Sequence, residues 1–296
     1  QDLPPFVIAL DGKPVGTIED GDSVVFFNFR GDRSIEITRA FEQESFAFFE
    51  RGERPDVYYA GMMQYDGDLR LPTNFLVPPP AIDATLGEHL AAAGVRQLAI
   101  SETQKLGHVT YFWNGNRTEP FDRSTETYVE IPSDTLPFEE RPWMKAAEIT
   151  DRLIAELRAG NYRHARVNYA NGDMVGHTGV RDAAVVAVEA VDLCLGRLLP
   201  VVVELGGVAI VTADHGNADE MYEIDKKAKA FARKKDGSPK AKTSHTLNQV
   251  PCHIVGARGL TLANVETPGL ANVAATVLHL MGYAAPGDFQ PSLVAG

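Results

Sequence analysis

The sequence has few of the features that mark secreted or membrane-spanning proteins. Only two of its 296 residues are cysteines, which is too few for a disulfide framework. Cys194 and Cys252 lie beside apolar residues, which predicts two buried thiols in a reducing compartment. No apolar run is long enough to cross a membrane, and residues 6–10 form too short a run for a signal peptide. The sequence therefore predicts a cytoplasmic protein with no membrane partner.

Positive charge is also scarce. The 28 Lys and Arg residues are outnumbered by 40 Asp and Glu residues, for a net charge of −12. This argues against nucleic acid as the main partner, because a phosphate backbone needs clustered cations. The exception is residues 226–242, which contain eight Lys and Arg residues. A solvated surface insertion is the favoured interpretation of this segment over an anion-binding patch, because charge runs usually face water.

The remaining pattern is typical of an α/β fold. Hydrophobic residues make up 44% of the chain and charged residues 23%, as in ordinary globular proteins. The run Val77-Pro78-Pro79-Pro80 predicts a linker, since consecutive prolines do not fit inside a regular element. Before it we expect strands at 24–29 and 57–61 and a helix at 34–49. After it we expect strands at 97–100, 109–112, 165–169, 208–212 and 253–255, and helices at 83–94, 142–159, 181–199 and 270–281. This alternation predicts a mostly parallel sheet flanked by helices on both faces.

Three polar stretches follow predicted strands and carry the residue types of a metal site. They are residues 168–178 (NYANGDMVGHT), 212–217 (TADHGN) and 243–246 (TSHT). Asp offers a hard oxygen and His a borderline nitrogen, a mixture that suits Mn²⁺, Zn²⁺ or Co²⁺. Asp173 and His177 are close enough in sequence to share one ion. Asp214 and His215 serve one ion together only if the backbone turns there, and otherwise two neighbouring ions.

A structural role for these residues is the alternative. A single Asp–His pair at the end of a strand is more often a hydrogen-bonded turn than a pair of ligands. Two such pairs together with His245, all at expected strand exits, favour metal binding. The spacing alone leads no further.

Five ordered stretches resemble motifs of the cofactor-independent phosphoglycerate mutases, which belong to the alkaline-phosphatase superfamily. The three metal stretches are joined by residues 27–33 (FNFRGDR) and 101–110 (SETQKLGHVT), which are similar to the family's double-arginine motif and its substrate-lysine motif. The resemblance covers nearly the whole chain and implies the fold of that superfamily. It implies interconversion of 3-phosphoglycerate and 2-phosphoglycerate in glycolysis and gluconeogenesis, through a phosphoserine and without 2,3-bisphosphoglycerate.

The resemblance also implies roles for individual residues. One ion would be held by Asp173, His177 and His245, and the other by Asp214 and His215. Substrate phosphate and carboxylate would be bound by Arg30, Arg33 and Lys105, which suits the chemistry of these side chains. A salt bridge at a helix entry, with Asp32 or Glu36, is the alternative role of the two arginines. Mn²⁺ is the expected metal, with Co²⁺, Mg²⁺ and Zn²⁺ as alternatives.

The family's serine nucleophile has no counterpart in this sequence. We therefore expect no catalytic nucleophile in this segment and a further N-terminal part that supplies it. Residues 1–76 would be the C-terminal portion of a second, substrate-binding α/β domain, residues 77–82 a linker, and residues 83–296 a metal-binding domain without its first strand. The expected assembly is a monomer, and the segment alone is expected to be inactive. The alternatives are a phosphatase or phosphopentomutase of the same superfamily, or an inactive metal- or partner-binding protein.

Overall fold

The computed structural model describes residues 6–67, 69–78, 82–225 and 227–296. Contacts divide the chain into two compact units. Unit 1 comprises residues 1–94 and 107–126, and unit 2 comprises residues 95–106 and 127–296. The predicted boundary at residues 77–82 stays a prediction, and residues 79–81 of that linker lie outside the described residues.

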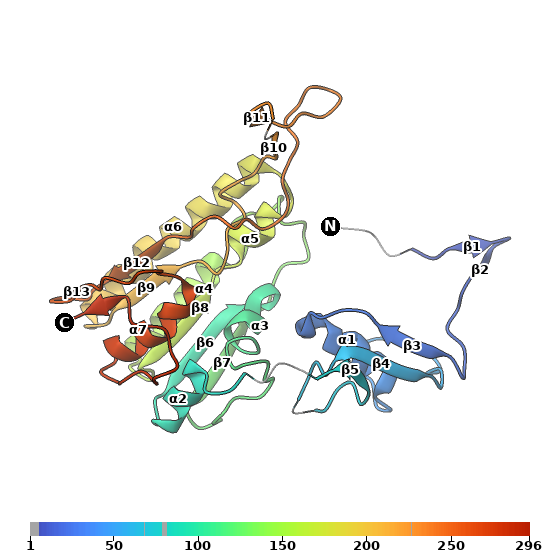
Figure 1. The fold of residues 1–296 in the computed structure, drawn as a ribbon, viewed down its shortest axis with the longest axis horizontal. Coiled ribbons are helices and arrows are strands. Elements are labelled where there is room, and N and C mark those ends of the chain that lie inside the picture. Colours follow the sequence, from blue (N-terminus) through green and yellow to red (C-terminus); the bar gives the residue numbers. More distant parts are fainter. Residues whose placement is uncertain (1–5, 68, 79–81, 226) are drawn as a thin grey trace. The chain divides into compact units, whose positions relative to one another are not determined.

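Unit 1 is a small parallel sheet with a helix against it (Figure 1). Its elements are β1 (Ala9–Leu10), β2 (Lys13–Pro14), β3 (Ser23–Phe26), α1 (Gly31–Glu42), β4 (Tyr58–Met63), β5 (Phe75–Val77) and α2 (Leu86–Ala92). The order of the main sheet is β3-β4-β5. Helix α1 packs on β4, because Phe41 stacks on Tyr59 at 4.9 Å and Thr38 shares a 3.1 Å hydrogen bond with the Tyr59 hydroxyl.

Several predictions for unit 1 were wrong in detail. The strand at 24–29 ends at Phe26 and its residues alternate between exposed and half-buried, so it is an edge strand and not a buried one. The first helix runs over 31–42 and not 34–49. Helix α2 begins at Leu86 and not at residue 83, and the hydroxyl of Thr85 caps it by accepting from the Glu88 amide at 3.3 Å.

The predicted strand at 109–112 is also wrong. A short helix, α3 (Leu106–Val109), is followed by turns, in which the Phe112 amide donates to the Gly107 carbonyl and the Asn114 amide to the Thr110 carbonyl. The β-branched and aromatic composition favoured a strand, but these local hydrogen bonds satisfy the backbone groups that a strand would offer to a neighbour.

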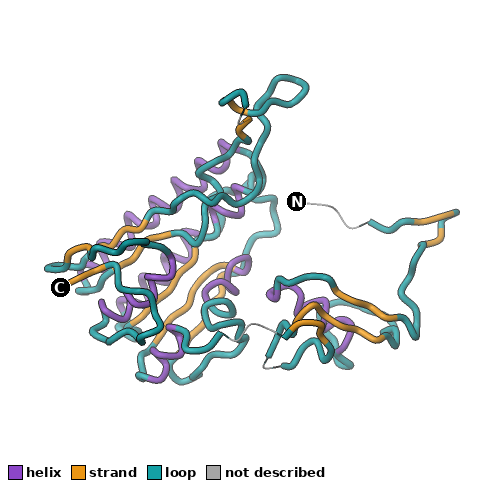
Figure 2. The backbone as a smooth tube through the Cα atoms, viewed as in Figure 1, coloured by secondary structure: helices purple, strands orange, loops and turns teal. Residues whose placement is uncertain are grey.

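Unit 2 contains a parallel pair of strands covered by helices (Figures 1 and 2). Its strands are β6 (Gln97–Glu102), β7 (Glu126–Ile131), β8 (His164–Asn168), β9 (Ala209–Thr212), β10 (Ile224–Asp225), β11 (Ala230–Phe231), β12 (Cys252–Val255), β13 (Thr261–Leu262) and β14 (Val294–Ala295). Its helices are η1 (Thr103–Lys105), α4 (Ala146–Arg158), α5 (Asn171–Gly176), α6 (Arg181–Glu204), η2 (Leu270–Asn272) and α7 (Val273–Leu280). The main sheet has the order β7-β6-β8, and β9 pairs with β12 in an antiparallel ladder. The predicted α/β class is confirmed.

The core of unit 2 lies between β6 and the helices α4 and α6. All six residues of β6 are buried, as expected for a strand covered on both faces. Leu98 and Ile100 pack with Ile149, Leu153 and Leu198 in one cluster. Cys194 is buried as predicted, whereas Cys252 is exposed because it begins a strand at the edge of its sheet. Among the described residues, no helix is both long and apolar enough to cross a membrane.

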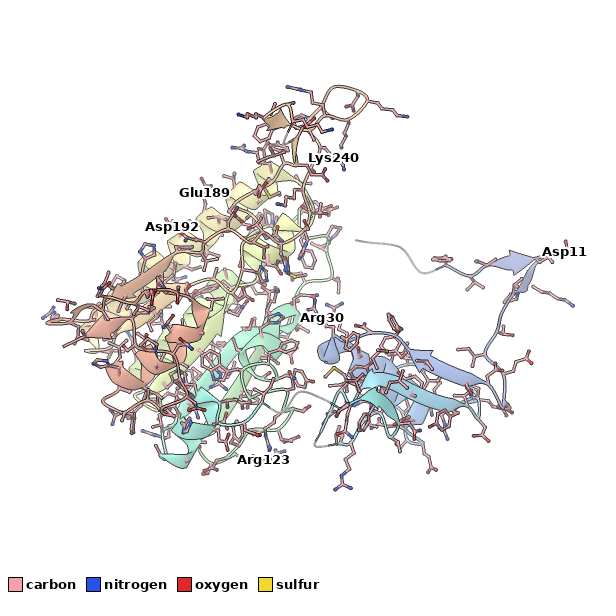
Figure 3. The ribbon with its side chains drawn as sticks, in the orientation of Figure 1. Asp11, Arg30, Arg123, Glu189, Asp192 and Lys240 are labelled. Carbon is pink, nitrogen blue, oxygen red and sulfur yellow. The ribbon has the colours of Figure 1, made fainter. Side chains whose placement is uncertain are left out.

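From residue 227 on, the basic segment belongs to an arm of unit 2 that includes strand β11 (Figure 1) and carries Lys240 (Figure 3). Two of its cations near the base are paired: Lys240 with Glu223 at 2.8 Å and Lys242 with Glu220 at 2.9 Å. Lys226 lies outside the described residues. The arm continues directly into the third metal stretch, so the ion pairs of Lys240 and Lys242 help to position residues 243–246.

A half-buried histidine in β8, His164, predicts acid sensitivity of unit 2. Burial lowers the pKa of His164 to about 3, and the nearby Arg166 cation acts in the same direction. The unfolded chain binds a proton there at a pKa of about 6.5, so the free energy of unfolding falls as pH drops from about 6.5 toward 3. The His164→Gln variant has no imidazole at this position, so it lacks this contribution to the pH dependence of the free energy of unfolding. Between pH 7 and pH 5, we expect wild type to lose about 1–2 kcal/mol more stability than the variant in urea unfolding. Equal losses would show that His164 is not held neutral.

Candidate metal centre

The polar stretches meet at the carboxyl ends of strands in unit 2. Turn η1 follows β6, helix α5 comes shortly after β8, and residues 213–217 follow β9. Ligands in α/β sheets gather at such strand ends, where loops diverge and leave space. Residues 243–246 enter from the basic arm and are held there by an isolated bridge between Gly216 and Thr246.

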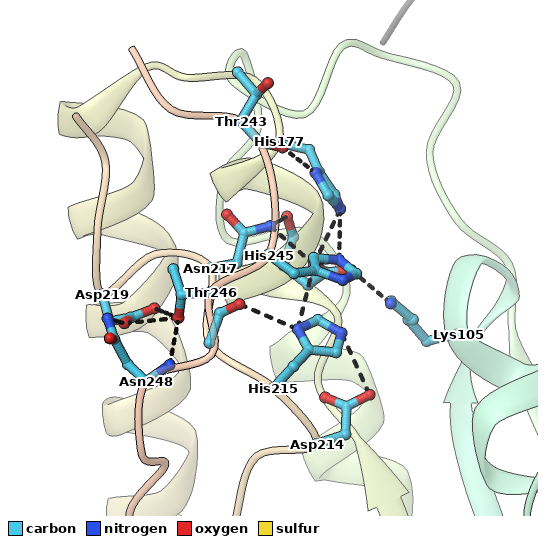
Figure 4. A network of polar contacts seen from close by, with 12 residues as sticks. Lys105, His177, Asp214, His215, Asn217, Asp219, Thr243, His245, Thr246 and Asn248 are labelled. Carbon is cyan, nitrogen blue, oxygen red and sulfur yellow. Dashed lines mark hydrogen bonds and ion pairs between the residues drawn. The ribbon is translucent and has the colours of Figure 1, made fainter. Parts of the chain in front are cut away.

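The rings of His177, His215 and His245 gather in one place (Figure 4), and each has a nitrogen near one oxygen of Asp173. The distances from Asp173 Oδ1 are 2.9 Å to His245 Nε2, 3.1 Å to His177 Nε2 and 4.0 Å to His215 Nδ1. Ligand atoms of Asp173, His215 and His245 all lie within 4.8 Å of one another, close enough to hold one ion.

Hydrogen bonding directs His177 toward this point. Its Nδ1 lies 2.6 Å from the Thr243 carbonyl oxygen. Because a carbonyl only accepts, Nδ1 carries a proton, which leaves the lone pair of Nε2 as the one that can bind a metal ion. That lone pair faces both the Asp173 carboxylate and His245 Nε2, which is 3.0 Å away. An arrangement of lone pairs aimed at one point suits a bound cation, so these residues fit a divalent metal ion.

A second group of predicted ligands, Asp214 and His215, adjoins the first. Asp214 Oδ2 lies 3.5 Å from His215 Nε2, and the ring of His215 stacks on that of His245 with centroids 3.6 Å apart. The imidazole of His215 therefore has one nitrogen toward Asp214 and the other toward Asp173. The backbone bends at residues 214 and 215. Such a bend is what Asp214 and His215 would need to share one ion.

Lys105 is part of the same cluster. It is only 5% exposed, and its ammonium lies 2.6 Å from Asp173 Oδ2. Burial opposes ionisation of Asp173, but Lys105, Asn217 and His177 outweigh it and lower the pKa of this carboxyl to about 2. Burial lowers the pKa of His245; Asp173 raises it, and His215 and His177 lower it again. A carboxylate and neutral imidazoles are the forms that bind metal ions.

A buried carboxyl group anchors the turn that carries Lys105. Glu102 accepts hydrogen bonds from the Ser133 hydroxyl at 2.8 Å and from the Lys145 amide at 3.2 Å. Burial raises the pKa of Glu102, and these two hydrogen bonds partly offset that effect. Glu102, which precedes Lys105 by three residues, thus connects the end of β6 to Ser133 and Lys145.

The five predicted metal residues lie together at this end of unit 2. Asp214 and His215 stay the predicted ligands of a second ion, and His215 faces the carboxylate of Asp173 as well as that of Asp214. Arg30 and Arg33 belong to unit 1, where Arg30 occupies the N-cap position of α1 and Arg33 lies exposed in the first turn of that helix. They stay predicted substrate residues.

Sequence reasoning missed the residues that hold the third metal stretch in place. Asp219 accepts from the Thr246 hydroxyl at 3.0 Å and from the Asn248 amide at 2.7 Å. Gly216 permits this contact, because a Cβ there would lie 2.1 Å from the Thr246 hydroxyl. The motif TADHGNAD contains both residues, but nothing in its spacing points to their partners.

Comparisons with known proteins agree with this chemistry. The chain is 55% identical over 296 residues to a protein from Leptospira interrogans named as a probable 2,3-bisphosphoglycerate-independent phosphoglycerate mutase. It is 52% identical to the phosphoglycerate mutase of that kind from Trypanosoma brucei brucei. Each match covers 99% of this chain and 54% of the relative, so the chain spans about half the length of these curated relatives.

A solved structure has the same fold. The chain superposes with a TM-score of 0.94 and 50% identity on Leishmania mexicana phosphoglycerate mutase, whose crystal structures were obtained at low cobalt concentration. The match covers 97% of this chain and 53% of that one. The sequence profile of the metalloenzyme superfamily matches residues 17–285. Since this profile spans most of the sequence, the chain belongs to the metalloenzyme superfamily.

Proposed function

We propose that this chain is the metal-binding portion, with part of the substrate-binding portion, of a 2,3-bisphosphoglycerate-independent phosphoglycerate mutase. The complete protein would interconvert 3-phosphoglycerate and 2-phosphoglycerate in glycolysis and gluconeogenesis, as a cytoplasmic monomer. The observation that carries the proposal is the convergence of Asp173, three histidines and Lys105 on one point. The names of the relatives support the same reaction.

The cluster suits two divalent ions. Asp173, His177 and His245 would hold one, and Asp214 and His215 would be ligands of the other, with His215 positioned between them. Mn²⁺ is the proposed metal, and the cobalt conditions of the Leishmania structure keep Co²⁺ a candidate. When bound, such ions activate a hydroxyl nucleophile and neutralise charge on the oxygens of a transferring phosphoryl group.

Lys105 would bind the substrate phosphate. Its ammonium has three donors, and the pair with Asp173 uses one of them. The others can hold a phosphate oxygen as a point charge. Arg30 is the N-cap residue of α1 and Arg33 lies in its first turn, so both guanidinium groups stem from the N-terminal end of that helix. This spacing suits two guanidinium groups that hold one glycerate carboxylate or phosphate while the phosphoryl group is transferred.

The rest of the complete protein would supply the serine that carries the phosphoryl group and a strand for the sheet. Among the described residues, β8 pairs only with β6, and β9 only with β12. Each of these strands therefore has an edge that can accept another strand. We propose residues 1–76 as part of the substrate-binding domain, 77–82 as a linker and 83–296 as most of the metal-binding domain.

The experiment that tests this function measures metal content and coupled mutase activity of the complete protein and its Asp214→Ala variant. We expect two metal ions per chain and activity without added 2,3-bisphosphoglycerate. The variant should bind fewer ions and lose its activity. Bound metal with hydrolysis of phosphate esters only would favour a phosphatase of the same superfamily, and absence of bound metal would overturn the proposal.

A further inference from the structure

The amide of Asn217 contacts the central carboxylate of the metal centre. Asn217 is 5% exposed and lies on the loop that follows β9. Its Nδ2 is 3.0 Å from Asp173 Oδ1 and 3.3 Å from the Asp173 carbonyl oxygen. One amide group therefore bridges a side-chain and a backbone acceptor of the same residue.

The orientation of this amide follows from its surroundings. Both atoms of Asp173 that it contacts are acceptors, so the NH₂ end and not the carbonyl end faces them. In the described part of the chain, Asn217 Oδ1 is buried without a hydrogen-bond partner. A buried acceptor left without a partner has a free-energy cost. The Asn217 side chain thus adopts an orientation that satisfies its NH₂ group but leaves its Oδ1 without a hydrogen bond.

A glycine in the first metal stretch makes room for Asn217. A Cβ at Gly176 would lie 2.3 Å from Asn217 Oδ1 and 2.8 Å from Cγ. Gly176 is in helix α5 without a positive φ, so space and not backbone conformation requires glycine there. Asp173 and Gly176 are three residues apart on α5 and share a face. The Asn217 side chain therefore fits over Gly176 and reaches Asp173.

We propose that Asn217 is a positioning residue that fixes the Asp173 carboxylate for metal binding, with Gly176 as the residue that admits it. Lys105 holds Oδ2 at 2.6 Å and Asn217 holds Oδ1 at 3.0 Å. With both oxygens held, the carboxylate does not rotate, and Oδ1 stays directed at the three histidines. Groups that orient a ligand in this way typically change metal affinity about 10–100-fold when they are removed.

The inference rests on the proposed metal site, and the test separates the two. Binding of Mn²⁺ alone is measured by electron paramagnetic resonance of the free ion, on the complete protein. We expect Asn217→Ala and Gly176→Ala each to weaken the Kd for Mn²⁺ by about 10-fold. Alanine is a better helix former than glycine, so Gly176→Ala does not disturb α5 itself. The matched control is Asn114→Ala, which removes a buried amide donor to Glu126, a carboxylate outside the metal centre; its Kd should change less than about 3-fold.

The double variant distinguishes positioning from general loosening. With alanine at 217 nothing obstructs a methyl group at 176, so Gly176→Ala should add no further loss in that background. Additive losses, or unchanged affinity in Asn217→Ala, would overturn the inference while leaving the metal site intact. Failure of wild type to bind Mn²⁺ would instead overturn the proposed function.

Discussion

Asp173→Asn is expected to lower the mutase activity of the complete protein by about 10³-fold. The substitution keeps the shape of the side chain but removes the charge on which three histidines and Lys105 converge. A bound ion contributes several kcal/mol of charge stabilisation to phosphoryl transfer, and each 1.4 kcal/mol is a factor of ten in rate. The measurements are coupled mutase activity and Mn²⁺ bound per chain.

The matched control for this variant is Asp192→Asn. Asp192 projects from α6 into solvent (Figure 3), so the same chemical change there should leave both quantities within about 2-fold of wild type. Retention of two bound ions and of near-normal activity in Asp173→Asn would show that the carboxylate is not a ligand.

Lys105→Met is expected to have the largest effect on the stability of the metal-free protein. The side chains of Lys105 and Asp173 are 7% and 14% exposed, so the variant leaves a largely buried carboxylate without its cation. Removing one partner of a buried pair costs about 3–5 kcal/mol. A divalent ion would replace the missing charge, so added Mn²⁺ should recover more stability in the variant than in wild type. Urea unfolding with and without Mn²⁺ measures both effects.

A second substitution tests the cause of that loss. Lys105→Met combined with Asp173→Asn has neither charge, so it should be more stable without metal than Lys105→Met alone. If Lys105→Met costs less than about 1 kcal/mol, or if the double variant is the less stable of the two, the ion pair does not have the role assigned to it.

The positions of the main elements of unit 2 were predictable because their signals are local. Strands β6, β8, β9 and β12 and helices α4 and α6 appeared close to the expected residues, since buried strands and amphipathic helices have distinct apolar periods. Local signals misled at residues 109–112, where composition favoured a strand but the chain turns. They also did not reveal that α6 continues past Pro200 to Glu204, where Leu198 and Val201 on either side of the proline are buried.

The sequence by itself determined which residue types could bind a metal and in which loops they lie, because Asp and His at the ends of predicted strands are few and ordered. Only the tertiary structure decided how they are grouped. The pairing of Lys105 with Asp173, the Thr243 carbonyl that orients His177 and the Asn217 amide on Asp173 each join residues far apart in the chain. Such contacts depend on how loops from different strands meet at one end of a sheet, and sequence spacing does not encode that distance.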